Sequence, residues 1–364
     1  MTKDCFKLYV RCFTFNHARY IKDTMDGFCL QQTNFPYVCI IVDDASSDGE
    51  QDVILSYLEQ NFVLNDDKIV RKKETEDYIM TFVQHRNNQN CFFAVYLLKY
   101  NHYSIHKSKM QYFTEFTNSV NYSALCEGDD YWIDSNKLQL QVDFLESHSN
   151  YTMTCNRTQL FSEKQKRIIG ESYCYNNSCD VDTKDVINRT GLFITTCSIV
   201  YRCCVEKDKP DYWKNCKVGD YPLQIACALK GCIYYFNKIM SVYRVENSKS
   251  WMGRQKFQSA SVSRMEFTKS KVDMFIGFAK DYPEYRLTLI SKAANDINQG
   301  IPTRKALKKD RDAYVAYFAD YINTYNLRWK IDLALCKTRI PFIRAIYSRL
   351  FLKKYKKRIR KYYN

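Results

Sequence analysis

Short apolar runs and segments of helical periodicity alternate along the first 150 residues. The four strand-like runs are Lys7–Phe13, Tyr37–Val42, Phe92–Leu98 and Ser123–Cys126. The second of these is apolar throughout, which is typical of a strand buried on both faces. The pieces between them have helical spacing: one carries Ile21, Met25 and Phe28, one begins near Asp52, and one carries Leu138, Val142 and Leu145. For the last helix we expect Asp134 or Ser135 as the N-terminal cap. This alternation predicts an α/β fold with a doubly wound sheet.

A polar cluster follows three of the predicted strands. These clusters are Thr14–Asn16, Asp43–Asp48 and Glu127–Asp130. In doubly wound sheets, ligands bind outside the carboxyl ends of the strands. The three clusters are therefore the first candidates for a binding site.

The remainder of the chain is less regular. Residues 151–251 mix strand-like and helix-like patterns, whereas the chain beyond Gln255 is mostly helical in pattern, with Pro283 and Pro302 as expected breaks. The chain contains neither an internal repeat nor a low-complexity segment.

The positive charge is concentrated at the C-terminus. The net charge of the 364 residues is +15, but eleven Lys and Arg and no acidic residue occur from Lys337 onward, so the preceding body carries only about +4 (44 basic against 40 acidic residues). Ile340–Asn364 alternates apolar residues with Lys and Arg, as basic amphipathic helices on anionic membrane surfaces do. A solvated tail and a nucleic-acid contact are the alternatives. We expect the membrane surface, and no nucleic acid.

The sixteen cysteines are expected to be reduced. No C-x-x-C pair occurs, many cysteines lie in apolar runs, and charges at the start of the chain interrupt any signal-peptide core. No apolar run approaches the ~20 residues that span a bilayer. We therefore expect a cytosolic protein without a transmembrane segment.

Glu127-Gly128-Asp129-Asp130 places three carboxylates within four residues. Like charges this close repel one another, and a divalent cation removes the conflict. Mg²⁺ is typically held by one or two carboxylates and by substrate phosphate oxygens. We expect Gly128 to let the backbone turn so that these side chains face one point. A solvated acidic turn before a helix is the alternative.

Four segments in order resemble the family 2 glycosyltransferases, which have the GT-A fold. These segments are Val10–Ile21, Ile40–Asp48, Ala124–Glu146 and Val218–Arg244. The resemblance implies a GT-A (Rossmann-like) domain over 1–250, with a mixed, mainly parallel central sheet flanked by helices. Residues 1–130 would bind the nucleotide-sugar and 131–250 the acceptor. Residues 251–364 would be a helical C-terminal region that ends in the basic tail.

The resemblance also assigns roles to individual residues. Asp44 matches the acid that binds the base or ribose, and Asp220 matches the catalytic base. The metal and diphosphate motif falls on Glu127, Asp129 and Asp130. The expected donor contacts are Phe13, Thr14, Phe15, Asn16, Asp44, Ser46, Lys107 and Asp129.

The chain departs from the family pattern in three places. Phe13 replaces the usual proline, where the contact is largely through the backbone. Glu127 replaces the first aspartate of the D-x-D motif. Val245 and Glu246 follow Tyr243-Arg244 where many relatives have a histidine, so Glu246 is not assigned a role.

Asp220 also has a purely structural interpretation. Gly219-Asp220-Tyr221-Pro222 has the pattern of a helix start, with aspartate as cap and proline in the first turn. The two roles are compatible. Phe193–Ser198 lies where relatives form the acceptor pocket, and a buried polar strand would explain this segment as well.

The leading hypothesis is an inverting glycosyltransferase that depends on Mg²⁺ or Mn²⁺ and uses a nucleotide-diphospho-sugar, with UDP-sugars favoured. We would then expect a glycan or lipid-linked acceptor and a role in bacterial surface polysaccharide or glycolipid synthesis. The enzyme would lie at the cytoplasmic face of the inner membrane. A nucleotidyltransferase is one alternative, but the Gly-rich phosphate loop expected near its N-terminus is absent. A non-catalytic membrane- or nucleic-acid-binding protein on a degenerate transferase fold is the other.

Overall fold

The computed structural model describes residues 6–189, 191–246, 262–300, 313–314 and 316–325. The chain divides into two compact units. The first consists of residues 1–211 and 218–257, and the second of residues 212–217 and 258–364. The predicted domain boundary at residue 250 falls in 247–261, outside the described residues.

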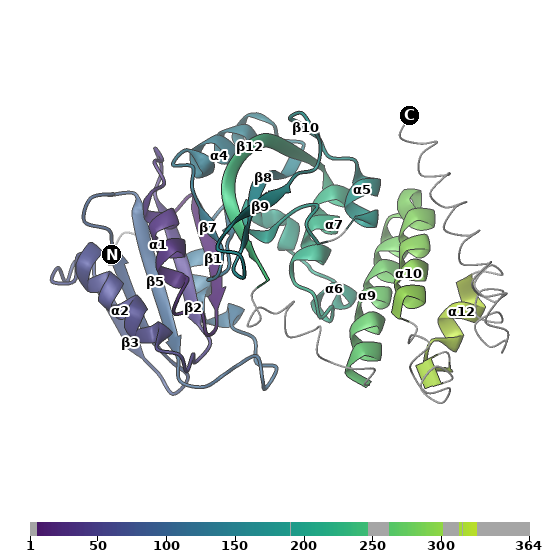
Figure 1. Cartoon of the computed structure of the whole chain (residues 1–364), viewed down its shortest axis with the longest axis horizontal. Helices are drawn as coiled ribbons and strands as arrows, with labels where there is room; N and C mark the ends of the chain where they lie inside the picture. Colours follow the sequence, from purple (N-terminus) through teal and green to yellow (C-terminus); the bar gives the residue numbers. More distant parts are fainter. Residues whose placement is uncertain (1–5, 190, 247–261, 301–312, 315, 326–364) are drawn as a thin grey trace. The chain divides into compact units, whose positions relative to one another are not determined.

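The described part of the first unit is built on one twelve-stranded sheet (Figure 1). Its centre consists of four parallel strands in the order β6 (Tyr122–Leu125), β1 (Leu8–Thr14), β2 (Tyr37–Asp43) and β5 (Cys91–Leu98). These strands match the four predicted runs to within about one residue at each end. The predicted mixed, mainly parallel central sheet is confirmed.

Strands of mixed direction flank this parallel centre. Beyond β5 lie β4 (Tyr78–Gln84) and β3 (Arg71–Glu74), both antiparallel to their neighbours. On the other side, antiparallel β11 (Val200–Arg202) joins β6 to β8 (Tyr151–Ser162), which pairs in parallel with β12 (Cys232–Val245). The short strands at this side are β7 (Tyr131–Trp132), β9 (Arg167–Ser172) and β10 (Cys179–Asp180).

Helices cover both faces of the central strands. Alternate residues of β1 and β2 belong to two separate core clusters, one on each face of the sheet. The first cluster includes side chains of α1 (Ile21–Cys29), α2 (Glu50–Asn61) and α4 (Lys137–Ser147); the second includes Phe113 and Phe116, from η1 (Met110–Phe113) and α3 (Thr114–Thr117). Every residue of β2 is buried, as its unbroken apolar pattern predicts. The remaining helices up to β12 are α5 (Thr183–Asn188), η2 (Thr196–Ser198), η3 (Cys203–Glu206), α6 (Asp211–Lys214) and α7 (Asp220–Lys230).

The predicted cap of α4 is wrong. The helix begins at Lys137, one position later than a Ser135 cap requires, and its N-cap is Asn136, which makes no side-chain cap hydrogen bond. The Asp134 carboxylate instead accepts a hydrogen bond from the Asn136 N–H at 2.9 Å and pairs with Lys238 at 2.6 Å. Asp134 therefore stabilises the turn before the helix and not the helix itself.

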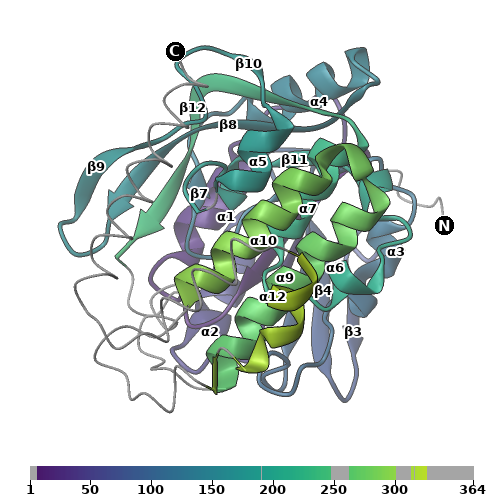
Figure 2. The same cartoon turned by 90° about the vertical axis from the view of Figure 1, so that its right-hand side faces the viewer.

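The described part of the second unit is helical, as predicted. It contains α9 (Val262–Asp281), η4 (Pro283–Tyr285), α10 (Arg286–Gly300) and α12 (Ala319–Tyr325), and α9 and α10 lie side by side (Figure 2). The expected break at Pro283 separates α9 from α10, because proline is tolerated only in the first turn of a helix. Pro302 and the basic tail Ile340–Asn364 lie outside the described residues.

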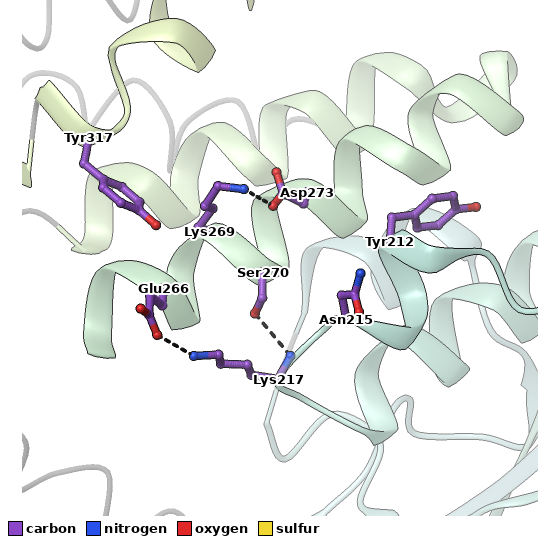
Figure 3. A pocket seen from close by; sticks show the side chains of 8 residues that line it. All are labelled: Tyr212, Asn215, Lys217, Glu266, Lys269, Ser270, Asp273 and Tyr317. Carbon is purple, nitrogen blue, oxygen red and sulfur yellow. Dashed lines mark hydrogen bonds and ion pairs between the residues drawn. The ribbon is translucent and has the colours of Figure 1, made fainter. Parts of the chain in front are cut away.

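A shallow pocket of about 210 Å³ lies within this unit (Figure 3). Its charged side chains pair with one another: Lys217 with Glu266 at 2.8 Å, and Lys269 with Asp273 at 2.5 Å. Because these charges are compensated, the pocket presents no group that calls for a ligand. Across the described residues of the chain, no helix is both long enough and apolar enough to cross a bilayer.

Candidate active site

Two loops meet at the carboxyl end of β1. Because β1 lies between β2 and β6 and is parallel to both, the loops that leave these two strands flank its last residues. The Asp44 N–H donates to the Thr14 carbonyl at 3.0 Å, and the Gly128 N–H donates to the Phe13 carbonyl at 3.1 Å. The structure therefore brings the Asp43–Asp48 and Glu127–Asp130 clusters to one edge of the sheet.

The turn after β1 is bonded to the loop after β2. Asn16 has a positive φ of 58°, a conformation that asparagine tolerates better than most residues. Its N–H donates to the Ser46 Oγ at 2.8 Å, and its side-chain oxygen accepts from the Ser47 N–H at 2.9 Å. Four predicted donor residues (Phe13, Thr14, Asn16 and Ser46) thus share one edge, and Phe15 lies in the same turn, half-buried.

Asp44 holds the loop that follows β5. Its side chain is buried, and its carboxylate accepts from the N–H groups of His102 at 2.7 Å and Tyr103 at 3.1 Å. The same carboxylate pairs with the Lys109 ammonium at 2.8 Å. These contacts fix the 101–109 loop beside the site. The predicted contact of Asp44 with a base or ribose stays a prediction.

Lys107 and Lys109 occupy different surroundings. The Lys107 ammonium donates to Asp77 and to the Tyr100 hydroxyl, both at 2.7 Å. Hydrogen bonds to Asp77 from Lys107, Tyr100 and Tyr112 hold the pKa of Asp77 well below its usual range. Lys109 contacts Asp44 and also helps to lower the pKa of Glu127. Of these two lysines, the structure therefore associates Lys109 with both acidic loops, whereas the predicted donor residue Lys107 is engaged with Asp77.

Each residue of the acidic loop has its own environment. Glu127 is exposed, yet the protein around it displaces enough solvent to raise its pKa to about 8, with Asp129 and Asp220 adding like charge. Asp129 is buried, with an oxygen 3.7 Å from the Nε2 of His17. Asp130 is buried, and its Oδ1 accepts from the Arg244 N–H at 2.9 Å. Burial, followed by the charge of Asp129, raises the pKa of Asp130 well above its ordinary value.

These residues fit a cation that a substrate phosphate helps to bind. The described residues contain no group of three or more His, Cys, Asp or Glu side chains arranged to hold a metal ion by themselves. However, the buried Oδ2 of Asp130 has no hydrogen-bond partner among the described residues, and carboxylate oxygens are the hard ligands that Mg²⁺ and Mn²⁺ prefer. A cation at such a site would depend on phosphate oxygens to complete its coordination. Binding of one ion by Glu127, Asp129 and Asp130 together stays a prediction.

Gly128 is required by a close contact and not by its backbone conformation. A Cβ at this position would lie 1.9 Å from the Thr14 hydroxyl oxygen and 3.2 Å from the Nδ1 of His17. Its φ lies outside the positive range that favours glycine. The expectation that Gly128 serves to turn the backbone is therefore corrected: it lets the acidic loop pack directly on the turn after β1.

Asp220 is the first residue of α7, and the N-cap is Gly219. The predicted capping role is therefore displaced by one position, although the N–H groups of Asp220 and Tyr221 still lower the pKa of the carboxyl. Burial has the larger effect and raises that pKa. The carboxylate accepts from the Thr196 hydroxyl at 3.3 Å, in the predicted acceptor segment Phe193–Ser198. The charge of Asp220 also contributes to the raised pKa of Glu127, so the two carboxyl groups interact electrostatically.

Sequence reasoning missed three charged residues at this site. Glu50, fully buried at the start of α2, accepts from the His17 N–H and the Ser46 hydroxyl, both at 2.8 Å. Arg244 donates to the Asp129 carbonyl at 2.7 Å and pairs with Glu163 at 3.1 Å, so it clamps the acidic loop. Desolvation raises the pKa values of Glu127 and Asp220, and the charge of Arg11 offsets part of this rise. Arg11 and Arg244 have a sequence signal, since each is a charge inside an apolar stretch of a strand, whereas Glu50 has none.

The comparisons with known proteins give relatives but no family. No protein-family model matches the chain. Uncharacterized proteins of Mycobacterium tuberculosis (Rv1520) and Mycobacterium bovis (Mb1547) are 27% identical to it over 261 residues, which are 71% of this chain and 62% of each relative. The aligned part of the chain thus spans less than two thirds of these relatives.

Solved structures resemble a larger part of the chain. S. aureus TarS residues 1–349 match with a TM-score of 0.55 and 14% identity, over 89% of this chain and 82% of that chain. The same fragment in complex with UDP matches with a TM-score of 0.54. A mannosyltransferase from Pyrobaculum calidifontis, in complex with GDP-Man and Mn²⁺, reaches a TM-score of 0.48 at 12% identity, a similarity too low to bear on this chain. The likeness to TarS shows the fold alone, and with the sheet described above it confirms the predicted fold class, a GT-A (Rossmann-like) α/β fold with a helical C-terminal extension.

Proposed function

We propose that this protein is an inverting glycosyltransferase that transfers a sugar from a nucleotide-diphospho-sugar to an acceptor hydroxyl and requires Mg²⁺ or Mn²⁺. UDP-sugars are the favoured donors. The observation that carries the proposal is the convergence of three acidic elements in the first unit. The Asp44 loop and the Glu127–Asp130 loop flank the end of β1, and Asp220 lies near enough to Glu127 to raise its pKa.

The donor would lie along the carboxyl edge of β1, β2 and β6. Phe13–Asn16, Asp44 and Ser46 would contact the nucleoside, and Glu127, Asp129 and Asp130 would face the diphosphate and its cation. When bound, the cation would offset the negative charge that develops on the departing nucleoside diphosphate. The TarS fragment of similar fold has been solved in complex with UDP, which supports a UDP-sugar as the donor.

Asp220 would be the general base. A hydroxyl has a pKa far above neutral, so a carboxylate must accept its proton as the new bond forms, an effect worth about 10²–10⁴-fold in rate. Burial raises the pKa of Asp220, which makes its carboxylate a stronger base. A single base on the face opposite the leaving group implies direct displacement by the acceptor oxygen, with inversion at the anomeric carbon.

The acceptor would be a glycan or a lipid-linked saccharide. Phe193–Ser198 would line its site, since Thr196 already contacts Asp220. Bacterial surface polysaccharide or glycolipid synthesis at the cytoplasmic face of the inner membrane would suit such an acceptor, and the basic tail Ile340–Asn364 would hold the enzyme to anionic lipid.

A panel of nucleotide-sugars tests the proposal. The full chain is incubated with each donor, with Mn²⁺, with Mg²⁺ or with EDTA, and released nucleoside diphosphate is measured. We expect turnover of one donor class with a divalent cation and none in EDTA. Failure of every donor to bind or react with either ion would refute the proposed function.

A further inference from the structure

We infer that His17 is a positioning residue: it holds the Asp129 carboxylate in the orientation in which that group binds the cation of the donor diphosphate. The inference rests on the proposed function and adds to it a residue from outside the acidic loop. His17 follows β1 directly and belongs to none of the expected donor or metal residues.

The two ring nitrogens of His17 face two different partners. Nδ1 is 3.1 Å from the Thr14 hydroxyl oxygen, a hydrogen bond, and Nε2 is 3.7 Å from the Oδ2 of Asp129, an ion-pair distance beyond the range of a hydrogen bond. His17 is only 8% exposed, so water does not compete freely for either ring nitrogen. A histidine held at one nitrogen presents the other in a fixed direction, and here that direction is toward Asp129.

Glu50, the first residue of α2, fixes this arrangement through hydrogen bonds. It is fully buried, and its carboxylate accepts from the Thr14 hydroxyl, from the His17 N–H at 2.8 Å and from the Ser46 hydroxyl at 2.8 Å. Backbone and ring of His17 are thus both restrained through one carboxylate. Because Ser46 belongs to the loop after β2, Glu50 also links the nucleotide side of the site to the cation side.

The packing of the acidic loop transmits the position of the ring. Gly128 approaches Thr14 and His17 so closely that a Cβ would lie 1.9 Å from the hydroxyl oxygen and 3.2 Å from Nδ1. Asp129, the next residue, therefore projects from backbone that rests on the His17 turn. Residues that orient a metal-binding side chain from behind typically change metal affinity about 10- to 100-fold when they are replaced.

Isothermal titration calorimetry on the full chain separates this role from general damage. UDP and GDP are titrated in the presence of Mn²⁺ and, separately, in EDTA. For His17→Phe we expect the Kd measured with Mn²⁺ to increase about 10- to 100-fold, and the Kd in EDTA to stay within about twofold of the wild-type value. His17→Gln, whose amide nitrogen approaches the position of Nε2, should keep more of the Mn²⁺-dependent affinity than His17→Phe.

Two further variants test whether weaker binding by His17→Phe comes from loss of the positioning role and not from general damage to the protein. Thr14→Val removes the hydroxyl between Glu50 and His17 without changing the shape of the side chain, so it should weaken Mn²⁺-dependent binding in the same direction. His148→Phe is the matched control, because His148 is exposed and stacks on Phe144 at the far end of α4, and it should bind as the wild type does.

The outcomes are distinguishable. In one outcome, the wild-type protein binds UDP or GDP more tightly with Mn²⁺, and His17→Phe and Thr14→Val bind with the wild-type Kd. This result would overturn the positioning role and leave the proposed function intact. An equal loss with Mn²⁺ and in EDTA would also overturn it, because it would show general damage to the nucleotide site. Wild-type protein that binds neither nucleotide under any condition would refute the proposed function, and this role of His17 with it.

Discussion

Three carboxyl groups of the site are held where ionisation is unfavourable. Loss of solvent raises the pKa values of exposed Glu127 and of the more buried Asp130 and Asp220, and neighbouring carboxylates raise the first two further. Arg11 and Lys109 offset only part of this charge, since the pKa of Glu127 remains at about 8. Carboxyl groups with strongly shifted pKa values cluster at functional sites, because catalysis and ligand binding require groups tuned in this way.

Asp220→Asn tests the general base directly. We expect kcat for sugar transfer to fall about 10²- to 10⁴-fold, because the amide cannot accept the acceptor proton, while the Kd for the donor stays unchanged. In the wild-type enzyme the basic form of Asp220 exists only above its raised pKa, so kcat should increase with pH through that value and then level off.

Asp182→Asn is a suitable control for that variant. Asp182 caps α5 by accepting from the Lys184 N–H, and asparagine caps helices equally well. We expect Asp182→Asn to transfer sugar at the wild-type rate and Asp220→Asn to transfer it at a strongly reduced rate. Equal rates for both variants would eliminate Asp220 as the base.

Strand β1 and the loops on either side of it organise the site. Each neighbouring loop is hydrogen-bonded to one of the last two carbonyls of β1, so the spacing of the loops follows from the parallel pairing of the strands. Close packing at Gly128 then sets the height of the acidic loop above the turn after β1. Small changes in this packing should therefore affect both stability and donor binding.

Gly128→Ala should test that packing. The new methyl group would overlap the Thr14 hydroxyl, and relief by a shift of the loop should cost about 1–3 kcal/mol in the free energy of unfolding. Urea denaturation measures this cost, and calorimetry with UDP and Mn²⁺ should show weaker binding. Gly170→Ala on β9 is the control, because a Cβ there meets no described atom within 4 Å. Equal stability of the two variants would contradict the close contact.

Helix α4 begins with a lysine that has no exposed surface. The Lys137 ammonium donates to the Ser198 carbonyl at 3.2 Å and to the Gln141 side chain, and burial lowers its pKa to about 8. Between pH 8 and 10.5 the unfolded chain therefore carries a proton on this group that the folded chain lacks. The contribution of Lys137 to the free energy of unfolding should therefore rise with pH across this interval, by up to about 3 kcal/mol.

Lys137→Met should remove this dependence. Methionine fills a similar volume without a charge, and the Ser198 carbonyl keeps a hydrogen bond from Gln141 at 3.1 Å. We expect urea denaturation to give a free energy of unfolding at pH 7 at least equal to that of the wild type, and the difference between variant and wild type to shift in favour of the wild type between pH 8 and 10.5. A difference that stays constant over this interval would contradict the lowered pKa of Lys137. Lys184→Met, at an exposed position of α5, should keep the wild-type profile.

Binding of donor and cation should be coupled across the first unit. Because the described residues contain no preformed cluster of three metal ligands, either ligand alone leaves the site incomplete. Mn²⁺ alone should barely change the melting temperature, and UDP alone should change it slightly. Mn²⁺ and UDP together should stabilise the protein by more than the sum of their separate effects. With saturating Mn²⁺ and UDP at 100 times its Kd, the stabilisation should be about 2.7 kcal/mol. Differential scanning calorimetry measures the three shifts, and strictly additive shifts would contradict the shared site.

The amino-acid sequence by itself determined the framework of this protein. The unbroken apolar run of β2 requires burial on both faces, and the polar residues that follow each strand lie at one edge because parallel strands end together. These features depend on neighbours along the chain, so they can be read from local pattern. The positions of the four central strands along the chain followed from them, whereas their order in the sheet did not.

Only the tertiary structure decided which side chains meet. The contacts of Arg244 with Asp23, of Glu50 with His17 and of Lys109 with Asp44 join residues 221, 33 and 65 positions apart. The direction of a lysine in a loop, the close approach of Gly128 and the inward position of Asp130 depend on how the loops pack. Local sequence pattern does not encode these contacts, because they arise only after distant strands have paired and brought their loops together.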